Sequence, residues 1–376
     1  MSSGSAQNVV TELLALAGAT INGDRPWDLR VHNEGLYDRL LREGSLGLGE
    51  SYMDGWWDCD QLDDLFHRLF WNRVDESVTT DWRTLTVGLK SRLFNLQTPF
   101  RARHNGSLPY SFGDDLFESM LDAQMVYSCA YWKRASTLDE AQEAKLDLVC
   151  RKLGLAPGQR VLDIGCGWGS FARYAAERYG VSVVGINLSL EQTRIARERC
   201  KPFPIEIRVQ DYRSLEGRCE FDHVVSIGMF EHVGYKNYRQ FMKIALSCLK
   251  PGGLFLLHTI GRNRSMTGAD PWIQRYVFPN AMLPSARQVA TAVEGLFVIE
   301  DWHNFSTDYD RTLMSWRARF EQNWHNLKGP RYDERFRRMW NYYLLASAAR
   351  FRARRNQLWQ IVLSERGVLG GYVAHR

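Results

Sequence analysis

A glycine-rich loop is the clearest chemical feature of the sequence. It follows a short apolar segment and reads Val161-Leu-Asp-Ile-Gly-Cys-Gly-Trp-Gly169, with Gly165, Gly167 and Gly169 on alternate positions. Glycine lets the backbone turn tightly and lets a ligand approach the chain closely. A loop of this kind after a strand therefore predicts a site for a nucleotide or a nucleoside.

Asp163 distinguishes between the two kinds of ligand that share this geometry. It lies just before the first glycine of the loop, and the GxGxxG spacing of dinucleotide sites is absent. A carboxylate at this position would repel a pyrophosphate, whereas it suits the positively charged aminoacyl end of S-adenosylmethionine. We therefore predict that the loop binds S-adenosylmethionine.

Polar residues after the next two apolar segments extend this site. Asn187 and Gln192 take the place where many nucleoside-binding domains carry an acid, so they would supply the hydrogen bonds to the ribose. Asp211 would accept a hydrogen bond from the adenine amino group, and Tyr212 would cover the ring. Turn chemistry could explain each residue alone, but their order after successive strands favours the cofactor role.

These residues require a parallel sheet to hold them. Short apolar segments alternate with helical patterns, which is typical of an α/β fold with helices on both faces of the sheet. We expect a Rossmann-like class I methyltransferase domain with strands at 160–164, 181–186, 205–209, 222–227 and 253–258, and helices at 139–153, 170–179, 191–200 and 238–249. Further helices are expected at 311–324 and 332–354, and a last strand at 358–363.

The N-terminal part has a different pattern. Residues 9–17 and 61–71 show the apolar spacing of helices. Residues 95–108 contain proline, asparagine, glycine and serine and read as a linker. We therefore predict a mostly helical domain over residues 1–100, for lipid contact or dimerisation, and a catalytic domain over 101–376.

Several longer motifs carry a family resemblance that covers nearly the whole chain. The sequence resembles the cyclopropane-fatty-acyl-phospholipid synthases and the related mycolic acid cyclopropane synthases, and its N-terminal motif is similar to the bacterial phospholipid branch. The motifs are Gly49-Glu-Ser-Tyr-Met-Asp-Gly-Trp-Trp57, Tyr127-Ser-Cys-Ala-Tyr-Trp132, the glycine loop, Met229-Phe-Glu-His-Val-Gly234, Leu256-Leu-His-Thr-Ile260, Asp270-Pro-Trp272, Asp301-Trp-His-Asn-Phe305 and Gln357-Leu-Trp-Gln360.

The resemblance implies methylene transfer from S-adenosylmethionine to a cis double bond of a phospholipid acyl chain. A carbocation forms, a proton leaves the new methyl group, and the ring closes, with a bound bicarbonate ion as the base. The bicarbonate-binding positions of the family match Cys129, Glu231, His258, Ile260 and Tyr309. The expected cofactor contacts also include Tyr127, Ser128, Leu188 and Gln210.

The residue types agree with this chemistry. An alkene has no proton to remove at the start, so no Ser-His-Asp arrangement is expected, and aromatic faces can stabilise a cation. Glu231 and His258 each lie at a predicted strand end, where the ligands of open sheets gather. With Tyr309 they could form a small anion site, in which His258 or Tyr309 would donate a hydrogen bond to Glu231.

Two positions depart from the family pattern. The segment Pro109-Tyr-Ser-Phe-Gly-Asp-Asp115 replaces a His-Tyr-Asp triplet before Gly-Asn-Asp. Ser347 stands where the family usually has a cysteine on a late helix, so no thiol at that position can take part in the chemistry.

Composition and charge indicate where the protein is located and what kind of partner it could have. The chain has 376 residues, no apolar run long enough for a membrane span and no basic start of a signal peptide, so we expect a cytoplasmic protein. Its seven cysteines form no CxxC pair, which predicts free thiols and no metal site. Nine basic and two acidic residues lie between Lys328 and Arg355. Such a stretch suits an anionic partner or a solvated helix face.

A phospholipid substrate gives this basic stretch a role. We expect reversible peripheral binding to the inner face of the membrane, with Trp56 and Trp57 as candidate contacts for lipid or for a dimer partner. The resemblance suggests a homodimer. The alternatives are a lipid C-methyltransferase that leaves a methyl or methylene branch, a non-catalytic lipid-binding protein, and an RNA methyltransferase. No RNA-binding module is recognisable, so we expect no nucleic-acid partner.

Overall fold

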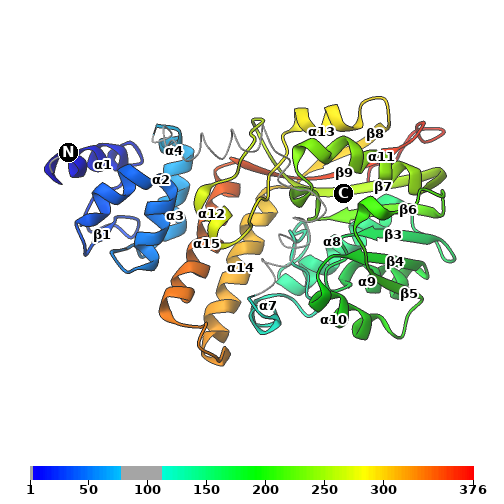
Figure 1. Ribbon diagram of the computed structural model, residues 1–376, viewed down its shortest axis with the longest axis horizontal. Helices are drawn as coiled ribbons and strands as arrows, with labels where there is room; N and C mark the ends of the chain where they lie inside the picture. Colours follow the sequence, from blue (N-terminus) through cyan, green and yellow to red (C-terminus); the bar gives the residue numbers. More distant parts are fainter. Residues whose placement is uncertain (1–2, 78–111) are drawn as a thin grey trace. The chain divides into compact units, whose positions relative to one another are not determined.

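The computed structural model describes residues 3–77 and 112–376 (Figure 1). These residues pack into two compact units. One unit contains residues 3–77, 267–279 and 309–356, and the other contains 112–266, 280–308 and 357–376. The predicted linker and the boundary near residue 100 lie outside the described residues. Two later segments pack with the N-terminal helices, which a single division between residues 1–100 and 101–376 did not anticipate.

A seven-stranded sheet forms the centre of the second unit. Its strand order is β5-β4-β3-β6-β7-β9-β8. The first five strands in this order pair in parallel, with Asp163 of β3 opposite Gly185 of β4 and Ile227 of β6 opposite His258 of β7. The strands are β3 (Arg160–Ile164), β4 (Ser182–Asn187), β5 (Ile205–Val209), β6 (Phe221–Ile227), β7 (Leu249–Arg262), β8 (Val298–Asn304) and β9 (Asn356–Ser364).

The sheet departs from the predicted parallel arrangement at one edge. Strands β8 and β9 pair antiparallel, with Trp302 opposite Ile361. Strand β8 was not predicted at all, because it lies at the edge of the sheet and has only one buried residue out of seven. Apolar periodicity reports which face of a strand is buried, and it carries no information on strand direction.

Helices cover both faces of this sheet, as the sequence predicts (Figure 1). Neighbouring residues of β3 show the alternation, since Val161 packs with α8 and α9 on one face and Leu162 packs with α11 and α13 on the other. Helix α8 begins at a capping box of Thr137 and Glu140. The helices are α7 (Asp114–Met120), α8 (Leu138–Leu153), α9 (Ser170–Tyr179), α10 (Leu190–Cys200), α11 (Tyr238–Cys248) and α13 (Ala286–Val293).

The other unit is mostly helical. Helix α15 packs against α2 and α3, and Gly49 of α2 lies so close to Trp272 that an added Cβ would be 2.3 Å from the indole. The two short strands β1 (Arg30–Val31) and β2 (Trp57–Asp58) pair antiparallel. The helices are α1 (Ser3–Leu16), α2 (Gly35–Met53), α3 (Leu62–Trp71), α4 (Val74–Ser77), α12 (Pro271–Tyr276), α14 (Thr307–Asn323) and α15 (Glu334–Arg352).

The proposed surface role of Trp57 is wrong. Its side chain is fully buried, and its Nε1 donates to Leu48 O and to Ser51 Oγ. Trp56 is partly buried, and the guanidinium of Arg39 lies over its ring at 4.9 Å. The Trp-Trp pair is therefore a structural element of the helical unit.

The basic stretch from Lys328 to Arg355 is largely neutralised within the helical unit. Arg338 pairs with Asp58, Arg352 with Asp63 and Asp310, and Arg355 with Asp75 and Glu76. Arg335, Arg337 and Arg350 also pair with carboxylates. Six of the nine basic side chains thus face acidic residues of the same unit, which weakens the case for an anionic partner at this stretch.

None of the helices within residues 3–77 and 112–376 is long and apolar enough to cross a membrane. All seven cysteines are free thiols.

Candidate active site

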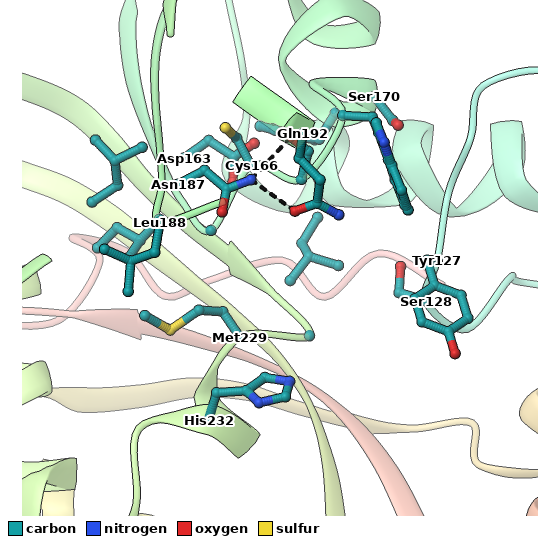
Figure 2. Close-up of a pocket in the computed structure, with 18 of the residues that line it drawn as sticks. Tyr127, Ser128, Asp163, Cys166, Ser170, Asn187, Leu188, Gln192, Met229 and His232 are labelled. Atoms are coloured by element: carbon teal, nitrogen blue, oxygen red, sulfur yellow. Dashed lines mark hydrogen bonds between the residues drawn. The ribbon is translucent and has the colours of Figure 1, made fainter. Parts of the chain in front are cut away.

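A cavity opens at the carboxyl ends of the parallel strands of the sheet (Figure 2). Asp163 from β3, Asn187 from β4, Gln210 after β5 and Gly228 after β6 all line it. Ligands of open α/β sheets bind at this edge. Ten of the twelve predicted cofactor residues line the cavity, namely Tyr127, Ser128, Asp163, Gly165, Gly167, Asn187, Leu188, Gln192, Gln210 and Tyr212.

The glycine loop has the backbone conformation that its sequence predicts. Gly165, Gly167 and Gly169 all have positive φ angles. A Cβ at Gly165 would lie 2.7 Å from the side chain of Met229, whereas a Cβ at Gly167 would meet no atom within 4 Å. The loop is anchored to β4, since the N–H groups of Gly165 and Cys166 both donate to Ile186 O.

Asp163 is a buried carboxylate with an unused acceptor. Its side chain is 1% exposed, and Oδ2 has no hydrogen-bond partner among the described residues. Burial raises the pKa of Asp163 to about 7, against the opposing charge of Lys145. A buried carboxylate oxygen without a partner is energetically unfavourable unless a hydrogen-bond donor binds to it. A cationic amino group would do so.

Asn187 and Gln192 were both predicted to bind the ribose, but the structure gives them different hydrogen bonds. Asn187 Nδ2 donates to Gly167 O at 3.2 Å and to Gln192 Oε1 at 2.9 Å, as the dashed lines of Figure 2 indicate in part. Its amide therefore ties the glycine loop to the start of α10. Gln192 Nε2 is buried and has no partner in the described part of the chain, so it is the donor that remains for a ligand.

Two predicted cofactor residues do not line the cavity. Gly169 is the residue before α9, where an added Cβ would be 2.7 Å from Cys200 Sγ, so its role is the close packing of the loop. The carboxylate of Asp211 accepts from the backbone N–H and the guanidinium of Arg213. It caps the short helix that contains Tyr212.

Some lining residues were not predicted. Lys145, Trp168, Met229 and His232 all line the cavity. Met229 and His232 lie in a motif that carried the family resemblance, and Trp168 lies within the glycine loop, so their positions were a usable signal. Lys145 lies on a predicted helix between Ala144 and Leu146, with Glu143 and Asp147 beyond them, and this pattern does not distinguish it from a surface lysine.

A second set of polar residues, Glu231, His258 and Gln360, comes from the loop after β6 and from the neighbouring strands β7 and β9. Glu231 Oε1 accepts from the backbone N–H of Ile260 at 2.6 Å. His258 lies two residues before Ile260 on β7. Gln360 Nε2 is 3.3 Å from His258 Nδ1. Glu231 Oε2 and His258 Nε2 are buried without partners among the described residues. The predicted donor to Glu231 was His258 or Tyr309, and the structure instead provides a backbone N–H.

Burial shifts the pKa values of Glu231 and His258 in the directions that favour their neutral forms. It raises the pKa of Glu231 to about 7. Burial, together with the charges of Lys145 and Lys152, lowers the pKa of His258 well below its usual value. A neutral imidazole that accepts at Nδ1 carries its proton on Nε2. Each of the two unpartnered atoms, Glu231 Oε2 and His258 Nε2, can therefore donate a hydrogen bond when Glu231 is protonated.

Comparison with known proteins agrees with this geometry. The model of the mycolic acid cyclopropane synthetase family matches residues 97–361. The chain is 52% identical over 363 residues to the cyclopropane-fatty-acyl-phospholipid synthase of Escherichia coli K12, covering 96% of this chain and 94% of that protein. This chain belongs to the cyclopropane synthetase family.

Two further relatives extend the comparison. The tuberculostearic acid methyltransferase UfaA1 of Mycobacterium tuberculosis is 33% identical over 362 residues, which cover 90% of this chain and 83% of that protein. The crystal structure of mycolic acid cyclopropane synthase CmaA1 complexed with SAH and CTAB is 31% identical, with a TM-score of 0.64, and covers 69% of this chain and 97% of that chain. The predicted Rossmann-like methyltransferase fold is thereby confirmed.

The cavity residues fit the cofactor of this family. Asp163 Oδ2, Gln192 Nε2 and Tyr212 Oη are buried, belong to lining residues and have no hydrogen-bond partner among the described residues. Buried polar atoms in folded proteins are rarely left in this state. The aminoacyl, ribose and adenine groups of S-adenosylmethionine would supply partners of the required kinds.

The remaining residues implied by the family resemblance lie in different places. Cys129 is fully buried, its Sγ donates to Ala130 O at 3.2 Å, and it does not line the cavity. Tyr309 belongs to the helical unit, where its ring packs on Phe351. Ser347, which replaces the family cysteine, lies on α15 of the same unit. The other departure, at residues 109–111, lies outside the described residues.

Proposed function

We propose that this chain is an S-adenosylmethionine-dependent synthase that converts the cis double bonds of unsaturated phospholipid acyl chains to cyclopropane rings. The observation that carries the substrate and the reaction is the 52% identity over 96% of the chain with a cyclopropane-fatty-acyl-phospholipid synthase. The cavity with its three orphaned polar atoms supports the cofactor independently.

Different residues of the cavity would hold different parts of the cofactor. S-adenosylmethionine supplies an electrophilic methyl carbon when it is bound. Asp163 would hold the amino group, Gln192 a ribose hydroxyl, and Tyr212 the adenine, as their orphaned atoms indicate. Fixing the methyl donor against the alkene lowers the entropic part of the barrier, and this positioning is the main catalytic task of the protein.

We propose a bicarbonate ion as the base that removes the proton before ring closure. Glu231 Oε2 and His258 Nε2 would hold it, because both atoms are buried and lack partners among the described residues. The N–H of Ile260 already donates to Glu231, so we assign Ile260 to the orientation of that side chain. Turnover should fall in carbonate-free buffer and return as bicarbonate is added. Unchanged turnover would exclude this base.

The decisive experiment is product analysis. The purified protein is incubated with methyl-labelled S-adenosylmethionine and vesicles of phospholipid with cis-unsaturated chains, and the fatty acids are analysed by gas chromatography with mass spectrometry. We expect labelled cyclopropane fatty acids, and none from saturated vesicles. A labelled methyl or methylene branch would instead indicate a lipid C-methyltransferase, the activity class named for the relative at 33% identity.

We further propose reversible peripheral association with the inner face of the membrane. Since most of the basic stretch is paired, the better candidates for lipid contact are exposed apolar side chains of the helical unit, Leu16 at 60% and Trp71 at 63% exposure. Co-flotation with anionic vesicles at low salt tests this. A Leu16→Ser/Trp71→Ser variant should float less well, and absence of the wild-type protein from the vesicle fraction would contradict the proposal.

A homodimer is the proposed assembly, on the basis of the family resemblance alone. Light scattering after size-exclusion chromatography measures the mass of the particle directly. A mass of one chain at micromolar concentration would contradict it.

A further inference from the structure

Lys145 is a buried cation at the wall of the cofactor cavity. It lies on α8 and is 1% exposed. Its Nζ donates to Ser128 Oγ at 2.7 Å, and within the described part of the chain this is the one hydrogen bond that the ammonium group makes. Both residues line the cavity that Asp163 also lines. Figure 2 shows Ser128 and Asp163 in this cavity.

This environment leaves the charge of Lys145 incompletely balanced. No carboxylate of the described residues lies within ion-pair distance of its Nζ, and Asp122 and Asp163 act on it only from farther away. Burial lowers the pKa of Lys145 to about 8, so the side chain still carries its proton at neutral pH. A buried ammonium with two unused N–H groups is unfavourable unless an anion joins it.

Lys152, on the same helix α8, is a buried lysine whose ammonium group has a carboxylate partner. It is fully buried as well, but its Nζ lies 3.1 Å from Asp301 Oδ2 and 3.1 Å from His303 Nδ1. It does not line the cavity. Of the two buried lysines among the described residues, Lys152 thus has a carboxylate partner, whereas Lys145 lines the cofactor cavity without one.

We infer that Lys145 and Ser128 together bind the α-carboxylate of S-adenosylmethionine, opposite the amino group that Asp163 receives. Ser128 Oγ accepts from Lys145, so its own O–H remains to donate to a second acceptor. A cation, a hydroxyl and a carboxylate on one cavity would then recognise the zwitterionic end of the cofactor. The inference rests on the proposed cofactor site and adds a residue that determines ligand specificity.

The test compares two ligands that differ only in the carboxylate. Dissociation constants of S-adenosylhomocysteine and its decarboxylated analogue are measured by titration calorimetry, without any turnover. We expect the wild-type protein to prefer S-adenosylhomocysteine by about ten- to one-hundred-fold, the range of a charge-assisted hydrogen bond. Lys145→Met should remove this preference by weakening S-adenosylhomocysteine alone.

Matched variants separate recognition from structure. Lys152→Met removes a buried lysine from the same helix outside the cavity, and it should keep the preference between the ligands. Asp163→Asn should weaken both ligands, because both retain the amino group. If Lys145→Met does not fold, Ser128→Ala, which removes the cavity-facing hydroxyl and keeps the cation, should still reduce the preference.

Three other results would overturn either the role of Lys145 or the proposed cofactor site. Equal affinity of the wild-type protein for both ligands overturns the role of Lys145 and leaves the cofactor site intact. An equal loss of both ligands in Lys145→Met makes the lysine a structural residue and also overturns the inference. Failure of the wild-type protein to bind either ligand contradicts the proposed cofactor site itself.

Discussion

The backbone N–H of Ile260 fixes the carboxyl group of Glu231 at a distance of 2.6 Å from Oε1. Glu231 lies in the short helix Phe230–His232 that follows β6, and Ile260 lies on the neighbouring strand β7. The sheet thus orients one oxygen of this side chain and leaves the other, Oε2, buried and without a partner among the described residues. A side chain held in this way is prepared to receive a further group.

Replacement of Glu231 by glutamine should separate binding from turnover. The amide keeps an oxygen for the N–H of Ile260 and changes the group at Oε2, so the fold and the cofactor cavity stay intact. We expect turnover to fall by about 100-fold or more, the usual cost of losing one preorganised polar group in an active site. Affinity for S-adenosylhomocysteine should be unchanged. Wild-type turnover would remove Glu231 from the proposed site.

The same variant should change the pH dependence of stability. The pKa of Glu231 is raised from 4.5 to about 7 by burial, so the folded wild-type protein loses stability as pH rises from about 4.5 to about 7. Each pKa unit corresponds to about 1.36 kcal/mol, which sets an upper limit of roughly 3 kcal/mol. Glu231→Gln lacks this loss. In bicarbonate-free buffer its melting temperature should exceed that of the wild type above pH 7, and the difference should vanish near pH 4.5.

The parts of the fold that were predictable depend on local signals. Helix α8 carries a capping box at Thr137 and ends at Gly154 in the left-handed conformation, and both signals are visible in the sequence. Strands β3, β4 and β6 are short segments in which most residues are apolar and buried. The antiparallel edge was not predictable, because β8 presents polar residues such as Glu300 and His303 and owes its place to pairing with β9.

The candidate site divides in the same way. The position of Asp163 and Gln192 at the cavity could be predicted because strand ends and helix starts can be located from sequence, and ligands gather there. Lys145 was missed, since a lysine on an amphipathic helix is usually at the surface and only tertiary packing buries it. Asp211 does not line the cavity, and its contact with the guanidinium of Arg213 could not be predicted from the sequence.

Two glycines of the cofactor loop should respond differently to alanine. Gly165 has a φ of 91°, and a Cβ there would lie 2.7 Å from the side chain of Met229. Gly167→Ala meets only open space, so its cost to the ligand-free protein should be about 1 kcal/mol from its left-handed conformation. Gly165→Ala should cost more, about 2 kcal/mol or above. Chemical denaturation measures both, and equal losses would contradict the close contact with Met229.

Ligand binding adds a second comparison for these variants. The open space beside Gly167 is part of the proposed cofactor cavity, so Gly167→Ala should weaken S-adenosylhomocysteine despite its small effect on stability. Calorimetric titration measures this. Unchanged affinity would mean that the cofactor does not pass close to Gly167.

Arg352 tests whether the basic stretch is structural. Its guanidinium joins three helices, with Nη1 at 2.8 Å from Asp63 Oδ2 on α3 and Nε at 2.9 Å from Asp310 Oδ2 on α14. Arg352→Met should lower the free energy of unfolding by about 1–3 kcal/mol, because two partly buried carboxylates lose their donor. The matched variant Arg366→Met removes a side chain that is 87% exposed and should have no effect. Equal stability of both variants, with vesicle binding lost only in Arg352→Met, would instead restore the membrane role.

We predict that Gln360 sets which nitrogen of His258 carries the proton. Its Nε2 lies 3.3 Å from His258 Nδ1, so the amide donates to Nδ1 and the neutral imidazole keeps its proton on Nε2. Gln360→Glu replaces this donor by an acceptor of nearly the same shape. It should move the proton to Nδ1 or charge the ring, which nitrogen-15 NMR of the histidine side chains detects directly. Turnover should fall by about tenfold or more, the value of one hydrogen bond to a charged group. Gln360→Met, which neither donates nor accepts strongly, should have a smaller effect because His258 can still adopt the active tautomer. If the methionine variant is as impaired as the glutamate variant, Gln360 acts by packing and not by setting the tautomer of His258.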